Sequence, residues 1–219
     1  MHVSHAVQDY LKVLHHLGGA DRLVSPLEVA ARLGVRAPSV TGMLKRLAEA
    51  GWIKYESGRG ARLTDTGCRE ALRVIRRHRL VEAFLHDVLK LDWSEVDAEA
   101  EALEHAISPR LEMAIAAFLG EPLEDPHGHP IPSSEGQIAA RKAEPLINFR
   151  AGDAFIVREV PDQDPDRLRR WRELGMVPGA RGHVVSYQPL DDVFEMALGN
   201  AIVRFGQEGL AGVLGERVS

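Results

Sequence analysis

Apolar residues recur three or four positions apart along the first quarter of the chain, the spacing of a helix with one buried face. Ser25 and Pro26 fit an N-cap and a first helical position. Gly18 and Gly51 stop the first and the last of these patterns. The pattern predicts three helices, over residues 4–17, 26–33 and 37–50.

Two short β-type segments follow the third helix. Residues 52–56 and 61–64 mix β-branched, aromatic and polar side chains, and the glycine-rich stretch 57–60 between them predicts a hairpin. Two helices joined by a tight turn and followed by a hairpin form a winged helix-turn-helix, so we expect the second of them to enter the major groove of DNA.

Two longer helices are predicted next, over residues 68–90 and 94–119. The second carries a long apolar stripe. This stripe is longer than one small domain needs, so we expect part of it to form the two-fold interface of a homodimer. The stripe consists of Leu103, Ile107, Leu111, Ala114, Ile115 and Phe118.

The pattern changes after residue 120. Residues 120–145 are rich in Pro, Gly and Ser and predict a connecting segment. From residue 146 the pattern is β-like, with a short helix over 165–174, and it suits a small β-barrel. The expected strands are 154–160, 180–187, 193–198 and 201–203. The predicted fold class is therefore mainly α, with a small C-terminal β-barrel.

The composition of the chain bears on its number of compact units and on its location in the cell. The chain has 219 residues, 45% of them hydrophobic, which suggests one to three compact units. Cys68 is the single cysteine, so no intramolecular disulfide forms. The N-terminus lacks the pattern of a signal peptide, and no apolar run reaches the roughly 18 residues of a membrane span. We expect a cytoplasmic protein without a membrane partner.

The net charge of −5 hides an asymmetry. Residues 32–79 contain twelve Lys or Arg and four Asp or Glu, whereas residues 92–104 contain six acids and no Lys or Arg. The basic segment suits phosphates and the acidic one suits cations, although solvated helix faces would give the same composition.

The basic segment coincides with the predicted reading head. Pro38 fits the first turn of the second helix, because no amide hydrogen is needed there. Hydroxyls in this turn suit bases or phosphates, and the basic hairpin suits phosphates or the minor groove. The alternative is a helix-turn-helix used for protein contacts, which does not need two hairpin arginines. The candidate DNA-binding residues are Arg36, Pro38, Ser39, Thr41, Lys45, Arg46, Arg59 and Arg62.

The acidic segment predicts a cation site. On one helix over 94–119, a single stripe would carry Asp97, Glu101, Glu104, His105 and Ser108, and a divalent cation would relieve the repulsion between its carboxylates. His78 and Glu82 interrupt an apolar face, and Asp9 lies at the edge of the first helix's stripe. Taken singly, His78 fits a satisfied core histidine and the acids fit solvated surface. Oxygen and imidazole donors together suit Mn, Fe(II), Co, Ni or Zn.

In several stretches the chain resembles the diphtheria-toxin-repressor (DtxR/MntR) family of metal-dependent regulators. The resemblance runs in order from about residue 4 to 132, and residues 146–219 resemble the family's SH3-like (FeoA-type) third domain through Glu173-Leu174-Gly175-Met176-Val177-Pro178-Gly179. The matching stretches are 9–11, 37–41, 77–82, 97–108 and the linker Pro126-His127-Gly128-His129-Pro130-Ile131-Pro132.

The resemblance implies a dimeric repressor that binds double-stranded operator DNA when loaded with Fe(II) or Mn(II). It implies a winged-helix domain over residues 1–67, a helical dimerisation and metal-binding domain over 68–132, a linker over 133–145 and the SH3-like domain over 146–219. By position, Asp9, Glu101, Glu104 and His105 resemble the primary, DNA-activating site. His78, Glu82 and Asp97 resemble the second site, to which Asp164 of the third domain would add a ligand.

The branches of this family differ at the primary site. Iron-responsive members have Met and Cys where this chain has Asp9 and Glu101, and manganese-responsive members have carboxylates there. Lys12 and the third domain depart from the manganese branch, which leaves open a bridged metal pair or two separate sites. We therefore expect Mn(II) as effector, with Fe(II) as the alternative.

Two other classes of function would fit parts of this pattern. A winged-helix regulator that senses an organic ligand would show no metal effect on operator affinity. A metallohydrolase needs an open coordination position and a general base, and the sequence has no HExxH motif. We therefore expect neither an organic substrate nor an enzyme.

Overall fold

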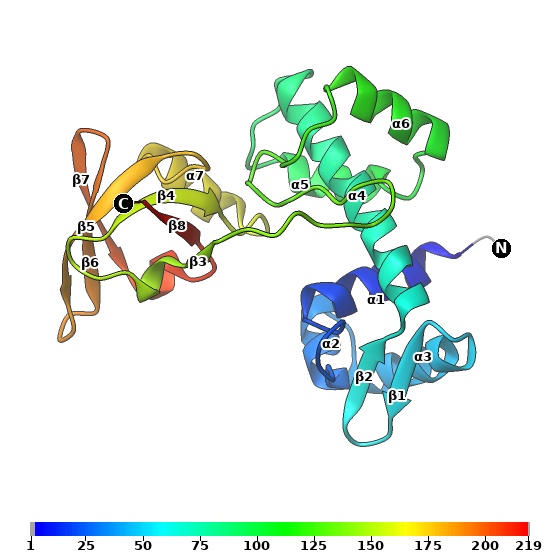
Figure 1. The fold of residues 1–219 in the computed structure, drawn as a ribbon. Helices are drawn as coiled ribbons and strands as arrows, with labels where there is room; N and C mark the ends of the chain where they lie inside the picture. The colour runs from blue at the N-terminus through cyan, green and yellow to red at the C-terminus, as the bar shows by residue number, and fades with distance from the viewer. Residues whose placement is uncertain (1–2, 219) are drawn as a thin grey trace. The chain divides into compact units, whose positions relative to one another are not determined.

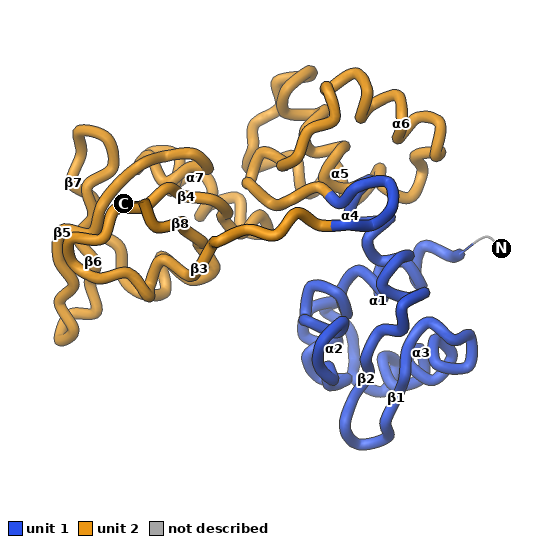
Figure 2. Tube along the Cα trace, viewed as in Figure 1, with its two compact units in different colours: residues 1–77, 132–137 blue, residues 78–131, 138–219 orange. Residues whose placement is uncertain are grey.

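The computed structural model describes residues 3–218, so the outer ends of the predicted first and third domains, at 1–2 and 219, lie outside it. The chain forms two compact units (Figure 2). Residues 1–77 with 132–137 form the first, and residues 78–131 with 138–219 form the second. The predicted division into three domains remains a proposal.

The first unit is a winged helix-turn-helix, as the sequence predicted (Figure 1). A capping box begins α2: the Ser25 hydroxyl accepts a hydrogen bond from the Glu28 amide, and the Glu28 carboxylate accepts one from the Ser25 amide. Gly34 then ends α2 with φ of 64°, a conformation that favours glycine. The unit consists of α1 (His5–His16), α2 (Pro26–Leu33), α3 (Ala37–Glu49), β1 (Ile53–Glu56), β2 (Gly60–Leu63) and the start of α4 (Asp65–Asp87).

The wing, which is the hairpin of β1 and β2, packs into the core of the first unit. β1 and β2 pair antiparallel with Ile53 opposite Leu63, and both side chains are buried with Val40 and Leu44 of α3. The outer face of α3 and the tip of the hairpin stay exposed. Packing thus holds α3 from behind and leaves its polar face for a ligand.

The prediction of one helix over 94–119 is wrong. The structure has two helices, α5 (Val96–Leu103) and α6 (Pro109–Phe118), separated by a turn. Pro109 lacks an amide hydrogen and suits a first helical position, and the Ser108 hydroxyl caps α6 by accepting from the Leu111 amide. Glu104 and His105 therefore lie at the end of α5 and in the turn, and Ser108 serves as a cap.

The helices of the second unit leave an apolar groove. The C-terminal half of α4 packs through Leu80 against Ile115 of α6, and through Val81 against Val96 of α5. Beside these small clusters lies a groove of about 440 Å³. Its lining is Val81, Phe84, Leu85, Leu89, Leu103, Ile107, Leu111, Ala114, Ile115 and Phe118.

The segment after α6 is more ordered than a connecting segment. Glu124 and Pro130 form an isolated antiparallel bridge, and Ile131 packs against Leu80. Asp125 and His127, within this bridge, are both buried. The expectation of a connecting segment from residue 120 is therefore wrong for 123–131, which folds as part of the second unit.

The C-terminal part of the second unit is an antiparallel sheet of six strands with α7 (Pro165–Glu173) packed against its core, as expected of a small barrel. Its strand order is β3-β8-β4-β5-β6-β7. Trp93, from the loop before α5, joins its core. Two strands were not predicted: β3 has only two residues, and β8 places a glycine and two charged residues among its five. The strands are β3 (Glu144–Pro145), β4 (Ala154–Glu159), β5 (Arg181–Gln188), β6 (Val193–Leu198), β7 (Ala201–Gly206) and β8 (Leu214–Val218).

Among the described residues, no helix combines the length and the apolar character that crossing a membrane would need.

Candidate metal centre and DNA-reading surface

His78 lies at the centre of the candidate metal site. It projects from α4 into the second unit and is 8% exposed. Its Nδ1 lies 2.7 Å from Glu104 Oε2, a hydrogen-bonding distance, and its Nε2 lies 3.3 Å from Asp97 Oδ1. A short Nδ1 contact with a carboxylate places the proton of a neutral imidazole on Nδ1 and leaves Nε2 free to bind a cation.

Two more carboxylates approach the same ring. Glu82 Oε1 lies 3.6 Å from Nε2, and Glu101 Oε2 lies 3.7 Å from Nδ1. Burial opposes a charge on His78, but the carboxylates of Asp97, Glu104 and Glu82 outweigh it and raise the pKa of His78 well above its usual value. Without a metal ion, the proton on His78 balances part of this negative charge.

The predicted primary ligands are divided between the two units. Glu104 is fully buried at the end of α5, with its Oε1 3.4 Å from His105 Nε2. Glu101 is exposed one turn earlier on α5. Asp9 lies on α1 of the first unit, so its approach to Glu104 and His105 remains a prediction.

A second group of candidate ligands was not predicted from the sequence as a ligand set. It joins Glu82 of α4, His127 of the bridged segment and Asp162, which follows β4. His127 Nδ1 lies 3.3 Å from Glu82 Oε1, and its Nε2 lies 2.7 Å from the Trp93 carbonyl oxygen. Since a carbonyl can only accept, Nε2 carries the proton, and the lone pair of a neutral Nδ1 faces the carboxylate of Glu82.

Glu82 gives the strongest support for a cation site. It is 0% exposed, and within residues 3–218 neither of its oxygens accepts a well-formed hydrogen bond. Burial opposes its ionisation, yet the imidazoles of His127 and His78 outweigh this and lower the pKa of Glu82 to about 2. A buried, ionised carboxylate is costly unless a positive charge lies beside it, and the two imidazoles or a metal ion can supply that charge.

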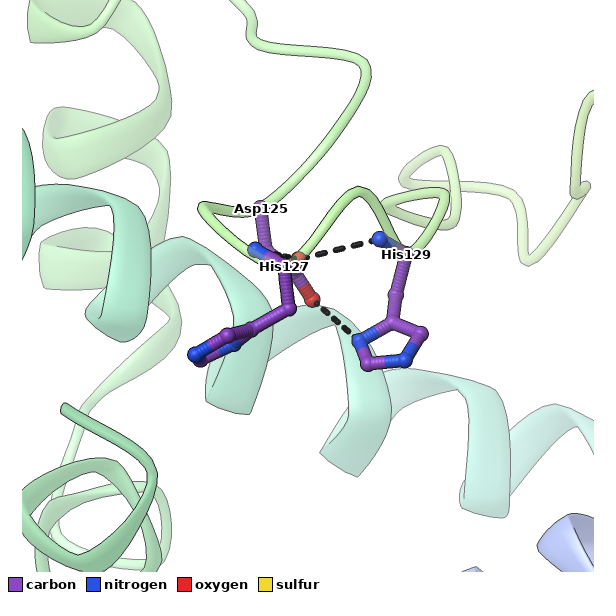
Figure 3. Close-up of side chains that lie close together, drawn as sticks. All are labelled: Asp125, His127 and His129. Atoms are coloured by element: carbon purple, nitrogen blue, oxygen red, sulfur yellow. Dashed lines mark hydrogen bonds and ion pairs between the residues drawn. The ribbon is translucent and has the colours of Figure 1, made fainter. Parts of the chain in front are cut away.

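Asp125 organises the loop that carries His127 (Figure 3). Its Oδ1 accepts hydrogen bonds from the amides of His127 and His129, at 2.8 Å and 3.0 Å. Its Oδ2 lies 3.1 Å from His129 Nδ1 and 3.6 Å from Arg79 Nε. Asp125, His127 and His129 also form a candidate ligand group, but the carboxylate of Asp125 already has these partners.

The structure places Asp164, the third-domain ligand suggested from the sequence, at the start of α7. Asp164 is the N-cap of α7, where its side chain accepts from the amides of Asp166 and Arg167. Asp162, two residues earlier, is the residue that approaches Glu82 and His127. The alternating histidines of Pro126-His127-Gly128-His129 were a usable signal for this site, whereas Asp162 had none.

The donor atoms fit Mn(II) or Fe(II). The groups around His78 and His127 offer carboxylate oxygen and imidazole nitrogen, with no sulfur atom among the grouped residues of 3–218. Hard oxygen and imidazole donors suit borderline divalent ions of the first transition row. The orphaned Glu82 carboxylate supplies the matching negative charge.

The predicted DNA-reading residues are placed on the open side of the first unit. All are exposed except Thr41, which is half-buried. The Thr41 hydroxyl donates to the Ala37 carbonyl at 3.1 Å, which leaves its lone pairs and its methyl group for DNA. Arg59, on the wing, pairs with the Glu56 carboxylate. The remaining predicted contacts are Arg36, Pro38, Ser39, Lys45, Arg46 and Arg62.

Three family models match the chain. Residues 2–61 match the iron dependent repressor N-terminal DNA binding domain, and residues 64–133 match the iron dependent repressor metal binding and dimerisation domain. Residues 144–209 match the FeoA domain. The matches follow the order winged helix, helical segment and small sheet.

Known proteins agree with these matches. The iron-dependent repressor IdeR of Mycobacterium leprae is 31% identical over 223 residues, which cover 95% of this chain and 96% of the relative. The diphtheria toxin repressor of Corynebacterium diphtheriae is 34% identical over 125 residues, covering 56% of this chain and 54% of that protein.

A solved structure is similar to nearly the whole chain. A manganese-dependent transcriptional repressor in complex with manganese is 36% identical, with a TM-score of 0.91, and the match covers 97% of this chain and 100% of that one. The chain therefore binds operator DNA and forms a homodimer, as its DNA-binding and dimerisation domains indicate. It belongs to the iron-dependent, or diphtheria-toxin-repressor, family of metal-dependent DNA-binding transcriptional repressors.

Proposed function

We propose that Mn(II) is the ion that activates this repressor for operator binding, with Fe(II) as the alternative. The observation that carries this proposal is the convergence of carboxylates on His78, together with the orphaned carboxylate of Glu82. Every grouped donor in the described residues is oxygen or nitrogen, which suits Mn(II) better than a thiolate or thioether would. The manganese complex of a repressor 36% identical to this chain supports the same choice.

We assign the primary site to Asp9, Glu101, Glu104 and His105. An ion held by these ligands would order the first helix and fix the spacing of two reading heads in the dimer. Coupling between an ion site and a DNA site is a difference in binding free energy, typically about 1–3 kcal/mol. The role of the residues is to supply charge and orientation, and we assign them no catalytic step.

We assign the second site to His78, Glu82 and Asp97 and extend it to His127 and Asp162. Glu82 belongs to both candidate groups, and His78 also contacts Glu104 of the primary site. Because metal-bound histidines usually donate their other ring N–H to a neighbouring acceptor, His78 is placed to orient Glu104.

We assign operator contact to the exposed face of α3 and to the wing, through Arg36, Pro38, Ser39, Thr41, Lys45, Arg46, Arg59 and Arg62. Phosphate contacts would come from the basic side chains, and base contacts from the first turn of α3. A protein that regulates transcription acts on chromosomal DNA, and we place it in the cytoplasm.

The apolar groove is our proposed dimer interface. Leu111 and Phe118 on α6 are 49% and 70% exposed, and the groove lining is entirely apolar. An apolar patch of this kind on a chain that forms a homodimer is the natural two-fold contact.

The test is operator binding under anaerobic conditions with Mn(II), Fe(II), Zn(II) or no metal. We expect weak binding without metal and tighter binding with Mn(II). His105→Ala should lose the stimulation while remaining a folded dimer, whereas Glu99→Ala, which removes an exposed acid of α5 outside the ligand groups, should keep it. Equal operator affinity with and without metal would favour a regulator that senses an organic ligand.

A further inference from the structure

Gly42 is an exposed glycine in the interior of α3. In a helix interior, glycine is less favourable than every other residue except proline, because it has the most backbone freedom to lose on folding. A glycine inside a helix therefore calls for a reason, either in the packing of the fold or in a ligand that needs the space of the missing side chain.

The fold of the first unit gives no such reason. The φ of Gly42 lies outside the left-handed region, and a Cβ added to Gly42 would meet no described atom within 4 Å beyond its chain neighbours and the nearby backbone of α3. Gly67 of α4 shows the contrast, because its added Cβ would stand 2.0 Å from the Trp52 carbonyl oxygen. Among the glycines of residues 3–218, Gly42 alone combines ordinary backbone geometry with open space.

This open space lies at the centre of the outer face of α3. Val40, Leu44 and Leu47 are buried and define the inner face of the helix. Because each residue of an α-helix turns by about 100°, Gly42 lies on the side almost directly opposite to them. Its neighbours on the helix surface are the residues three and four positions away, and all of these are exposed. They are four of the proposed operator contacts, Pro38, Ser39, Lys45 and Arg46.

A missing side chain at this point changes how deeply α3 can enter DNA. The major groove is about 12 Å wide and about 8.5 Å deep, and a helix with its side chains is about 10–12 Å across. A helix with large side chains on its leading face therefore fills the groove before its main chain comes near the bases. A bare Cα at the centre of that face removes this obstacle.

We propose that Gly42 is a specificity-determining residue, whose missing side chain lets the main chain of α3 pack directly against base edges of the operator. This inference rests on the proposed function, because it assumes that α3 contacts the operator. The short side chains of Pro38 and Ser39 reach base edges only when the helix is seated deeply. The long side chains of Lys45 and Arg46 reach phosphates from further away, so they depend less on the depth of the helix.

The test compares the full-length wild type with Gly42→Ala on two DNA duplexes of equal length. One duplex carries the sequence that the wild type selects from a randomised library, and the other carries the same bases in scrambled order. Fluorescence anisotropy measures both affinities with Mn(II) or Fe(II), whichever ion supports selection by the wild type. Gly42→Ala should weaken binding to the selected duplex by about tenfold or more, and binding to the scrambled duplex by less than about twofold.

Thermal melts provide the second readout. Gly42→Ala should raise the melting temperature by about 2–4 °C, because alanine favours the helix and meets nothing in the fold. The matched control is Ala31→Gly, which makes the reverse change at an exposed residue of α2. It should lower the melting temperature and leave both DNA affinities unchanged. A lower melting temperature of Gly42→Ala would show that the fold itself needs the glycine and would overturn the inference.

Arg46→Ala separates this inference from the proposed function. If Arg46→Ala and Gly42→Ala both bind the two duplexes as the wild type does, α3 does not contact the operator and the proposed contact fails. If Arg46→Ala binds more weakly while Gly42→Ala keeps the wild-type affinity for the selected duplex, α3 contacts DNA but Gly42 does not determine specificity. An equal loss of affinity for both duplexes in Gly42→Ala would also overturn the inference.

Discussion

Gly128 lies against the main-chain carbonyl of Arg158, so close that an added Cβ would stand 1.8 Å from the oxygen. Gly128 also has φ of 86°, and the neighbouring His127 carbonyl accepts a hydrogen bond from the Val160 amide at 3.0 Å. The bridged segment and the end of β4 are therefore in direct contact, and this contact brings Asp162 toward His127.

We expect Gly128→Ala to weaken binding of the second ion, because the new methyl group must push β4 and Asp162 away from His127. Gly152→Ala is the matched control: its φ of 92° imposes a similar backbone strain, and no described atom outside its chain neighbours lies within 4 Å of the added Cβ. Both variants should lose about 1–2 kcal/mol of stability from the left-handed conformation, and Gly128→Ala should lose more because of its contact with Arg158. Calorimetric Mn(II) titration should show weaker second-ion binding in Gly128→Ala alone, and equal binding in the two variants would contradict this role.

The stability of the metal-free protein should fall as the pH rises from about 6.5 to 9. Burial opposes a charge on His129, but Asp125 and Asp162 outweigh it and raise the pKa of His129 to about 9. The folded state then holds a proton that the unfolded state has released, so this contribution is complete below pH 6.5 and disappears through pH 9.

Urea unfolding at pH 6, 7.5 and 9, after treatment with a chelator, measures this effect. His78 and His127, whose pKa values are also raised, act in the same direction. His129→Gln should therefore reduce the slope of stability against pH without abolishing it. A slope as steep as that of the wild type would show that His129 does not contribute.

The sequence indicated the winged helix and the acidic stripe, because each depends on local spacing or local turn chemistry. It was wrong about residues 94–119, although Ser108 followed by Pro109 is a helix start that takes precedence over a continuous apolar stripe. Asp162 could not be predicted as a ligand candidate. Asp162 lies 80 residues after Glu82 in the chain, and it approaches Glu82 only because β4 packs against the bridged segment. No local sequence pattern predicts such a contact.

Phe118→Glu should give monomers that bind the operator poorly. Phe118 is 70% exposed at the groove, so a carboxylate there disturbs the proposed interface and not the interior of the monomer. Ile115→Glu is a poorer test, because Ile115 is 8% exposed and packs with Leu80, so its loss would also unfold the helices. Leu190→Glu, at a fully exposed residue between β5 and β6, is the control and should remain dimeric. Analytical ultracentrifugation measures the oligomeric state of each variant. A dimeric Phe118→Glu would show that the interface lies outside the groove.

Arg59→Ala should weaken binding to every DNA sequence and reduce the slope of log affinity against log salt by about 1, as expected for one lost phosphate contact. Arg204→Ala is a matched control in the third domain, since Arg204 is exposed and also pairs with a glutamate, Glu195. Ser39→Ala, in the first turn of α3, should alter sequence preference and leave the salt slope unchanged. Fluorescence anisotropy at several salt concentrations measures each effect. If Arg59→Ala and Arg204→Ala behave alike, the wing does not contact DNA.

The metal response should favour Mn(II) over Fe(II) through Asp9 and Glu101. Raw affinity for divalent ions rises from Mn(II) toward Cu(II), so selectivity must appear in activation, where Mn(II) needs enough oxygen ligands to reach the geometry that orders α1. Replacing Asp9 by Met and Glu101 by Cys should shift activation toward Fe(II) or softer ions. Asp21→Met with Glu99→Cys introduces the same side chains outside the ligand groups and should leave the ranking unchanged. Anaerobic operator titrations against buffered free metal compare the three proteins. A wild type that responds to Fe(II) at lower free metal than to Mn(II) would reverse the assignment of the effector, while the family and the DNA-binding role would stand.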